Sequence, residues 1–61
     1  MSWVGHVYDK WGFTCGMAPA LGGVYWHVSH PVYGVRYGYQ GNKTAAHHAI
    51  NWAIGDMRNY V

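Results

Sequence analysis

The feature that most constrains this chain is a long uncharged run, because no Asp, Glu, Lys or Arg occurs from Trp11 to Val35. As a helix, this run would measure roughly 37 Å, enough to cross the hydrocarbon core of a bilayer with some tilt. Charged residues make up only 10% of the chain, far below the roughly 25% of an ordinary globular domain. Since such a composition supplies little water-facing surface, we predict a transmembrane helix over about residues 11–30.

Small and bulky residues separate on this expected helix. At about 100° per residue, one narrow stripe collects the small side chains and both histidines of the run, while the bulky apolar side chains fall on the opposite face. Small residues four positions apart allow a second helix to approach closely in a bilayer. We therefore predict that a partner helix packs on this stripe, at Gly12, Gly16, Ala20 and Gly23.

Aromatic residues bracket the run, as expected for rings that anchor a span at two membrane interfaces. They include Trp3, Tyr8 and Trp11 before it and Tyr33, Tyr37 and Tyr39 after it. The alternative is that these rings fill the core of a small water-soluble protein. We favour the membrane interpretation.

His27 and His30 are one helical turn apart, which would place both imidazoles on one side of the span. Two such histidines can ligate haem, chlorophyll or a metal ion. They also lie close to the expected interface, where a histidine can hydrogen-bond water, a lipid headgroup or a carbonyl group. We therefore predict no cofactor, and ligation through His27 and His30 is the alternative.

The C-terminal residues show the clearest helical pattern in the sequence. Thr44 suits an N-cap position, and the apolar residues that follow it recur at helical spacing. These are Ala46, Ala49, Ile50, Ala53, Ile54, Met57, Tyr60 and Val61. We predict an amphipathic helix over about residues 45–60 that docks on a protein partner through Ile50, Ala53, Ile54 and Met57.

A Gly- and Tyr-rich segment over residues 31–43 separates the two expected helices. Its alternating Val35, Tyr37 and Tyr39 also fit a β-strand. A lone strand, however, has no partner in an otherwise helical chain, so we predict an irregular connector here.

Residues suited to catalysis are scarce. Asp9 and Asp56 are the only carboxylates and lie far apart in the sequence, and Cys15 is the only cysteine. Cysteine among small and apolar neighbours is typical of a packing residue, and the net charge of +2 with scattered basic residues does not suit nucleic-acid binding. We expect neither an enzyme nor a nucleic-acid-binding protein.

These patterns together predict an all-α membrane protein of one domain. It would have an interfacial N-terminus (1–10), a span (11–30), a connector (31–43) and an amphipathic helix (44–61). The excess of basic residues after the span weakly places the C-terminus on the matrix or cytoplasmic side. The predicted contacts are the lipid bilayer and the subunits of a larger membrane complex.

This layout resembles the small single-span accessory subunits of mitochondrial respiratory complexes, although no residue motif carries the resemblance. It implies a location in the mitochondrial inner membrane and a structural role in assembly or stability of a respiratory complex. Two alternatives stay open. One is a leaderless bacteriocin-like membrane-active peptide, and the other is a small soluble binding module that completes its core by oligomerisation.

Overall fold

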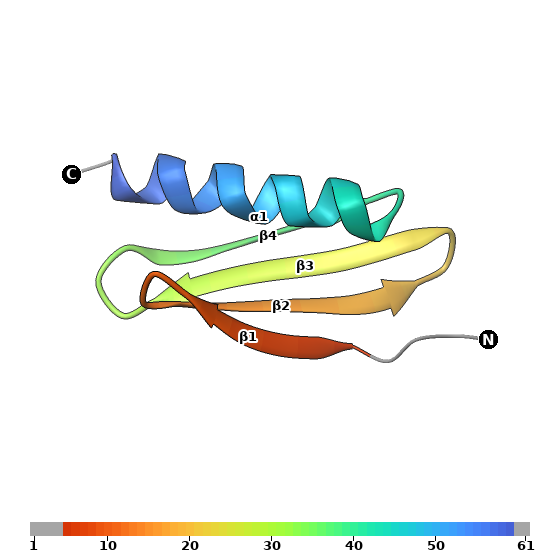
Figure 1. Ribbon diagram of the computed structural model, residues 1–61, viewed down its shortest axis with the longest axis horizontal. Coiled ribbons are helices and arrows are strands. Elements are labelled where there is room, and N and C mark those ends of the chain that lie inside the picture. The colour runs from red at the N-terminus through yellow and green to blue at the C-terminus, as the bar shows by residue number, and fades with distance from the viewer. Residues whose placement is uncertain (1–4, 60–61) are drawn as a thin grey trace.

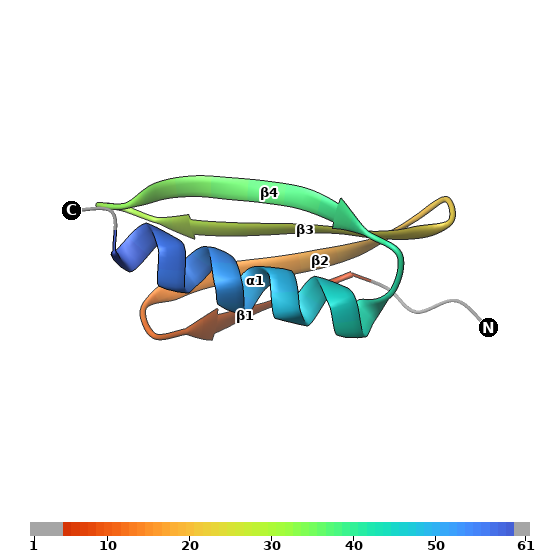
Figure 2. The same ribbon diagram turned by 90° about the horizontal axis from the view of Figure 1, so that it is seen from above.

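Four antiparallel strands and one helix make up the part of the chain that the structure, a computed structural model, describes, residues 5–59 (Figure 1). The elements are β1 (His6–Lys10), β2 (Phe13–Ala20), β3 (Gly23–His30), β4 (Gly34–Gln40) and α1 (Lys43–Arg58). Each strand pairs with the next one in sequence, so the sheet order is β1-β2-β3-β4. Helix α1 lies along one face of this sheet (Figures 1 and 2).

The predicted all-α membrane fold is therefore wrong. The expected span over residues 11–30 consists of β2 and β3, which form an antiparallel hairpin. Among residues 5–59, no helix is both long enough and apolar enough to cross a membrane. The predictions of a transmembrane helix and of an integral protein of the mitochondrial inner membrane are accordingly wrong as well.

Tight turns explain why the uncharged run folds into strands. Trp11 and Gly12 both have positive φ, 54° and 83°, which is the geometry of the two-residue turns that match the twist of a β-hairpin. Gly22, with φ 77°, follows Leu21 in the turn between β2 and β3. Pro19 is tolerated because β1 pairs with β2 only as far as Met17, so β2 is an edge strand at the proline.

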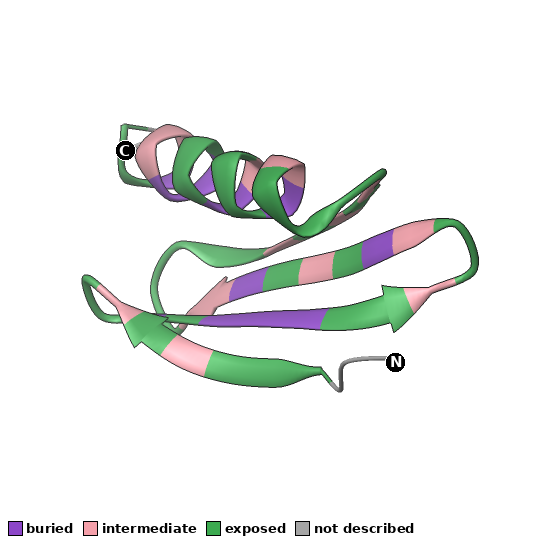
Figure 3. Ribbon diagram, turned by 45° about the vertical axis from the view of Figure 1, so that its right-hand side comes forward, coloured by how far each residue is buried: buried purple, intermediate pink, exposed green. Residues whose placement is uncertain are grey.

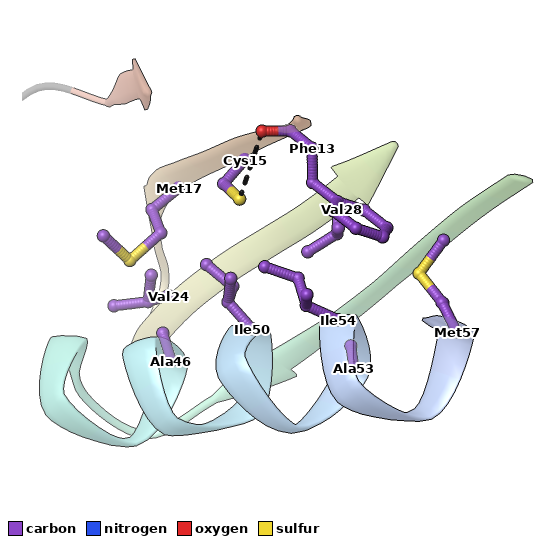
Figure 4. Close-up of a cluster of buried hydrophobic side chains, with 10 residues drawn as sticks. All are labelled: Phe13, Cys15, Met17, Val24, Val28, Ala46, Ile50, Ala53, Ile54 and Met57. Carbon is purple, nitrogen blue, oxygen red and sulfur yellow. Dashed lines mark hydrogen bonds between the residues drawn. The ribbon is translucent and has the colours of Figure 1, made fainter. Parts of the chain in front are cut away.

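The hydrophobic core lies between α1 and the covered face of the sheet. Figure 3 shows the buried positions of α1 on the side that faces the strands. Ile50 and Ile54 point from α1 towards Cys15 and Val28 on the two central strands (Figure 4). Among the described residues, the buried hydrophobic set is Phe13, Cys15, Met17, Val24, Val28, Ala46, Ile50, Ala53, Ile54 and Met57.

Helix α1 is the amphipathic helix that the C-terminal pattern predicts, although its boundaries differ. The N-cap is Asn42 and not Thr44, since the Asn42 side chain accepts a hydrogen bond of 2.8 Å from the backbone N–H of Ala45. An Asn side chain satisfies one of the free N–H groups at a helix start as well as a Thr does. Trp3, which was expected at a membrane interface, and Tyr60 and Val61, which were expected on the apolar face of this helix, lie outside the described residues.

The segment predicted as an irregular connector is largely strand β4. Val35, Tyr37 and Tyr39 alternate in β4 as a strand requires, and they pair with Ser29, His27 and Tyr25 of β3. The prediction of a connector was wrong because β3, the strand that pairs with β4, had been predicted as part of the transmembrane helix.

Candidate functional site

The face of the sheet opposite α1, which we call the open face, carries the candidate site. Successive side chains of a strand point to opposite faces, so the neighbours of the buried residues point away from the helix. The strand register places these open-face residues side by side in rows across the sheet. One row is Val7, Gly16, His27 and Tyr37, and the next is Ala18, Tyr25 and Tyr39.

The open face exposes an unusual amount of apolar surface. Tyr37 is 80% exposed and Val7 is 68% exposed, and Tyr25, Val35 and Tyr39 are exposed as well. Surface apolar residues that occur singly need no explanation, whereas a contiguous patch indicates an interaction site. Tyr25, Tyr37, Tyr39 and Val35 are neighbours on β3 and β4, so these four form such a patch, and Val7 lies across β2 from it.

A hollow of about 840 Å³ lies over the middle of this face. Its lining includes the small residues Gly16 and Ala18 of β2, with Val7 on the β1 side. On the other side, Tyr25 and Tyr37 contribute to the lining. The open face therefore has a groove whose floor on β2 is formed by small residues and whose wall on β3 and β4 is a tyrosine ridge that consists of Tyr25, Tyr37 and Tyr39.

Two glycines allow aromatic rings to lie close to the sheet. A Cβ atom on Gly16 would collide with the His27 imidazole, and one on Gly23 would lie 2.6 Å from the Tyr39 hydroxyl. The Tyr39 hydroxyl donates a 2.9 Å hydrogen bond to the carbonyl of Leu21. Its ring also meets Tyr25 edge-on, with 5.4 Å between the ring centroids, a favourable aromatic geometry.

The open face carries almost no formal charge. Within residues 5–59, Asp9 is its only Asp, Glu, Lys or Arg, because none of the four basic residues of the chain lies on it. Lys10 donates a hydrogen bond to Asn51 of α1, and Arg36 forms a 2.8 Å salt bridge with Asp56 of α1. Both of these basic side chains therefore lie on the covered side of the sheet.

The other two basic residues belong to the helix. Lys43 is in the first turn of α1, and Arg58 lies near its C-terminal end, 5.7 Å from the centroid of the Trp11 ring. A groove that follows a nucleic-acid backbone needs clustered cations. The open face thus suits an uncharged partner.

The groups with nucleophilic potential are in the covered layer. Cys15 is fully buried, and burial raises the pKa of its thiol, so the unreactive protonated form dominates at neutral pH. Burial also raises the pKa of the neighbouring Tyr8. Within residues 5–59, no three side chains of His, Cys, Asp or Glu are grouped to hold a metal ion.

The structure does not bring His27 and His30 together. His27 lies over Gly16 on the open face, whereas His30 points to the covered face, since its β3 neighbour two residues earlier is the buried Val28. The His30 Nδ1 accepts a 3.0 Å hydrogen bond from the backbone N–H of Val32. The prediction of no cofactor, with ligation of haem, chlorophyll or a metal by these histidines as its alternative, stays untested.

The residues predicted to pack on partners occupy three places. Gly12 is in the turn between β1 and β2, and Gly16, Ala20 and Gly23 lie on the open face. Ile50, Ala53, Ile54 and Met57 pack against the sheet of their own chain. Sequence reasoning missed the tyrosine ridge, although the alternation of Val35, Tyr37 and Tyr39 was the signal for it.

Comparison with known proteins finds no matching family model, no similar curated protein and no similar solved structure.

Proposed function

We propose that this protein is a small non-catalytic binding module that uses the open face of its sheet to bind an uncharged, apolar protein surface. The observation that carries the proposal is the tyrosine ridge along an apolar groove, on a face whose only Asp, Glu, Lys or Arg within residues 5–59 is Asp9. Tyrosine is enriched in protein interfaces because it combines a large contact area with few rotatable bonds.

The difference in burial between the two faces of the sheet supports this proposal. Within residues 5–59, the ten buried hydrophobic side chains all belong to the covered layer or to α1, so the apolar residues of the open face contribute little to the core. Exposed apolar side chains raise the risk of aggregation. Among residues 5–59, five of the ten exposed large apolar residues share this face, while the others are spread over the turns and α1, and a partner that covers the face would shield these five together.

Three other roles stay untested. A structural part in a respiratory or other assembly fits a binding module, although no helix within residues 5–59 could place it across a membrane. The bacteriocin-like role is likewise untested. Single-stranded nucleic acid can stack on aromatic rings of a sheet, yet the basic residues point away from the tyrosine ridge, and we expect weak binding to DNA or RNA.

Site-specific photo-crosslinking in the cells that make the protein tests the proposal. One variant carries p-benzoylphenylalanine in place of Tyr37, and the matched control carries it in place of Trp52, which is 69% exposed on α1. We expect a covalent adduct of defined mass from position 37 and none from position 52. Absence of an adduct at 37, or equal adducts at both positions, would contradict the proposal.

A further inference from the structure

We propose that the partner of the open face is the open face of a second copy of this chain, in a two-fold symmetric dimer. This inference rests on the proposed function and names its partner. It follows from the shape, charge and exposed area of the open face.

The shape of the open face is self-complementary. The small residues of the groove floor, Gly16 and Ala18, are on β2, and its tyrosine wall is on β3 and β4, on the other side of the sheet centre. A two-fold axis that lies between the two faces and runs roughly along the strands exchanges these sides. It therefore places the tyrosine ridge of each copy over the groove of the other, as an isologous interface requires.

The same axis predicts which residues meet. Rotation about the strand direction preserves the position along the strand, so each row faces the equivalent row of the partner. In the row of Val7, Gly16, His27 and Tyr37, Val7 of one copy would lie over Tyr37 of the other. Two copies of Val7 would lie at opposite edges of the interface and would not meet.

The charge of the open face permits such a pair. Asp9 is on the edge strand β1, in the row that ends with Val35 on β4. The two-fold axis would place each Asp9 near Val35 of the other copy, at the rim and far from the second Asp9. No like charges would be brought together in the centre, where repulsion would be costly.

The exposed area sets the expected strength. The open parts of Val7, Tyr25, Val35, Tyr37 and Tyr39 amount to on the order of 600 Å² per copy. A pair would then bury about 1,200 Å² in total, at the low end of specific interfaces. We expect a dimer that dissociates in the micromolar range, not an obligate one.

Paired cysteine variants test the geometry directly. The single variants Val7→Cys and Tyr37→Cys are purified separately, mixed at about 100 µM and oxidised gently; the native Cys15 is fully buried and takes no part. We expect a disulfide-linked dimer from the mixture at least tenfold faster than from either variant alone. Equal rates in all three samples would overturn the proposed arrangement.

Sedimentation equilibrium of the full chain from about 1 to 300 µM tests the dimer itself. We expect Tyr37→Glu to weaken association at least tenfold, whereas the control Trp52→Glu leaves it unchanged. A wild-type monomer at all concentrations would overturn the dimer. If the photo-crosslinker at position 37 then gave an adduct to a different protein, the proposed binding function would stand without the dimer. Absence of any adduct at position 37 would contradict both the binding function and the dimer.

Discussion

The two faces of the sheet are built from alternate residues of the same four strands, and yet their apolar side chains differ in exposure to solvent. On the covered face, Phe13, Met17 and Val28 are almost completely shielded by α1. On the open face, Val7 and Tyr37 remain largely exposed. Hydrophobicity alone thus does not distinguish the two faces. The covered face therefore stabilises the fold of the single chain, and the apolar surface of the open face is the surface that we propose a partner covers.

The largest expected effect comes from the core of the covered face. Ile54→Ala removes a fully buried side chain, which costs about 2–5 kcal/mol, and a core of this size rarely supplies more than about 5 kcal/mol. We expect this variant to be largely unfolded by circular dichroism at 25 °C. Val35→Ala, at a position 62% exposed on the open face, should change the free energy of unfolding by less than about 0.5 kcal/mol. Equal losses would show that the open face also stabilises the monomer.

Two glycines of the open face differ in what an added Cβ atom would meet. A Cβ atom on Gly23 would collide with the backbone carbonyl of Gln40, so the strands must shift, and we expect Gly23→Ala to cost about 2 kcal/mol in urea unfolding. A Cβ atom on Gly16 meets only the His27 ring, which can rotate towards solvent. We expect Gly16→Ala to cost less than about 1 kcal/mol.

The double variant Gly16→Ala/His27→Ala provides the control for this pair. Because it removes the ring that the new methyl group would meet, it should be no less stable than His27→Ala alone. A large cost of Gly16→Ala that persists in the double variant would indicate that the floor of the groove is as tightly packed as the core.

Alkaline pH should weaken the covered face specifically. Burial raises the pKa of the Cys15 thiol above its ordinary value of 9.0, so just above pH 9 the unfolded chain loses the thiol proton while the folded chain retains it. The folded state then binds more protons, and the free energy of unfolding falls as pH rises, by at most about 1.4 kcal/mol per pH unit. When the free energy of unfolding in urea is measured from pH 8 to 10, its decrease with pH should be smaller for Cys15→Ala than for the wild type. An unchanged slope would mean that another group, such as Tyr8, causes the loss.

The amphipathic helix could be predicted from sequence because its signal is local. Ala46, Ile50, Ala53 and Ile54 recur at helical spacing, and all four are buried. The pattern predicted that this face docks on a protein partner, whereas it packs on the sheet of its own chain. It could not show that the protein surface is the sheet of the same chain, because that contact joins residues far apart in sequence.

The strands could not be predicted in the same way, because two periodicities overlap in the uncharged run. Gly12, Gly16 and Ala20 are four apart, which fits a helix stripe, while Phe13, Cys15 and Met17 alternate, which fits a strand. The turn at Leu21 and Gly22 separates two alternating segments, and reading the run as one helix concealed it. The open face was missed for the same reason, since it exists only when β2, β3 and β4 are side by side.

The smallest effect concerns the margin of the covered face, where Arg36 of β4 and Asp56 of α1 form a salt bridge with both side chains more than one-third exposed. Exposed ion pairs contribute at most about 1 kcal/mol and are screened by salt. We expect Asp56→Asn to lower the free energy of unfolding by that amount or less at low ionic strength and to have no effect in about 1 M NaCl. Asp9→Asn removes the same charge from the open face, where no salt bridge is formed within residues 5–59, and should be neutral at both salt concentrations. If both variants lost the same free energy of unfolding with the same salt dependence, the cause would be the change in net charge and not the salt bridge. The contact between α1 and β4 would then depend on apolar packing alone.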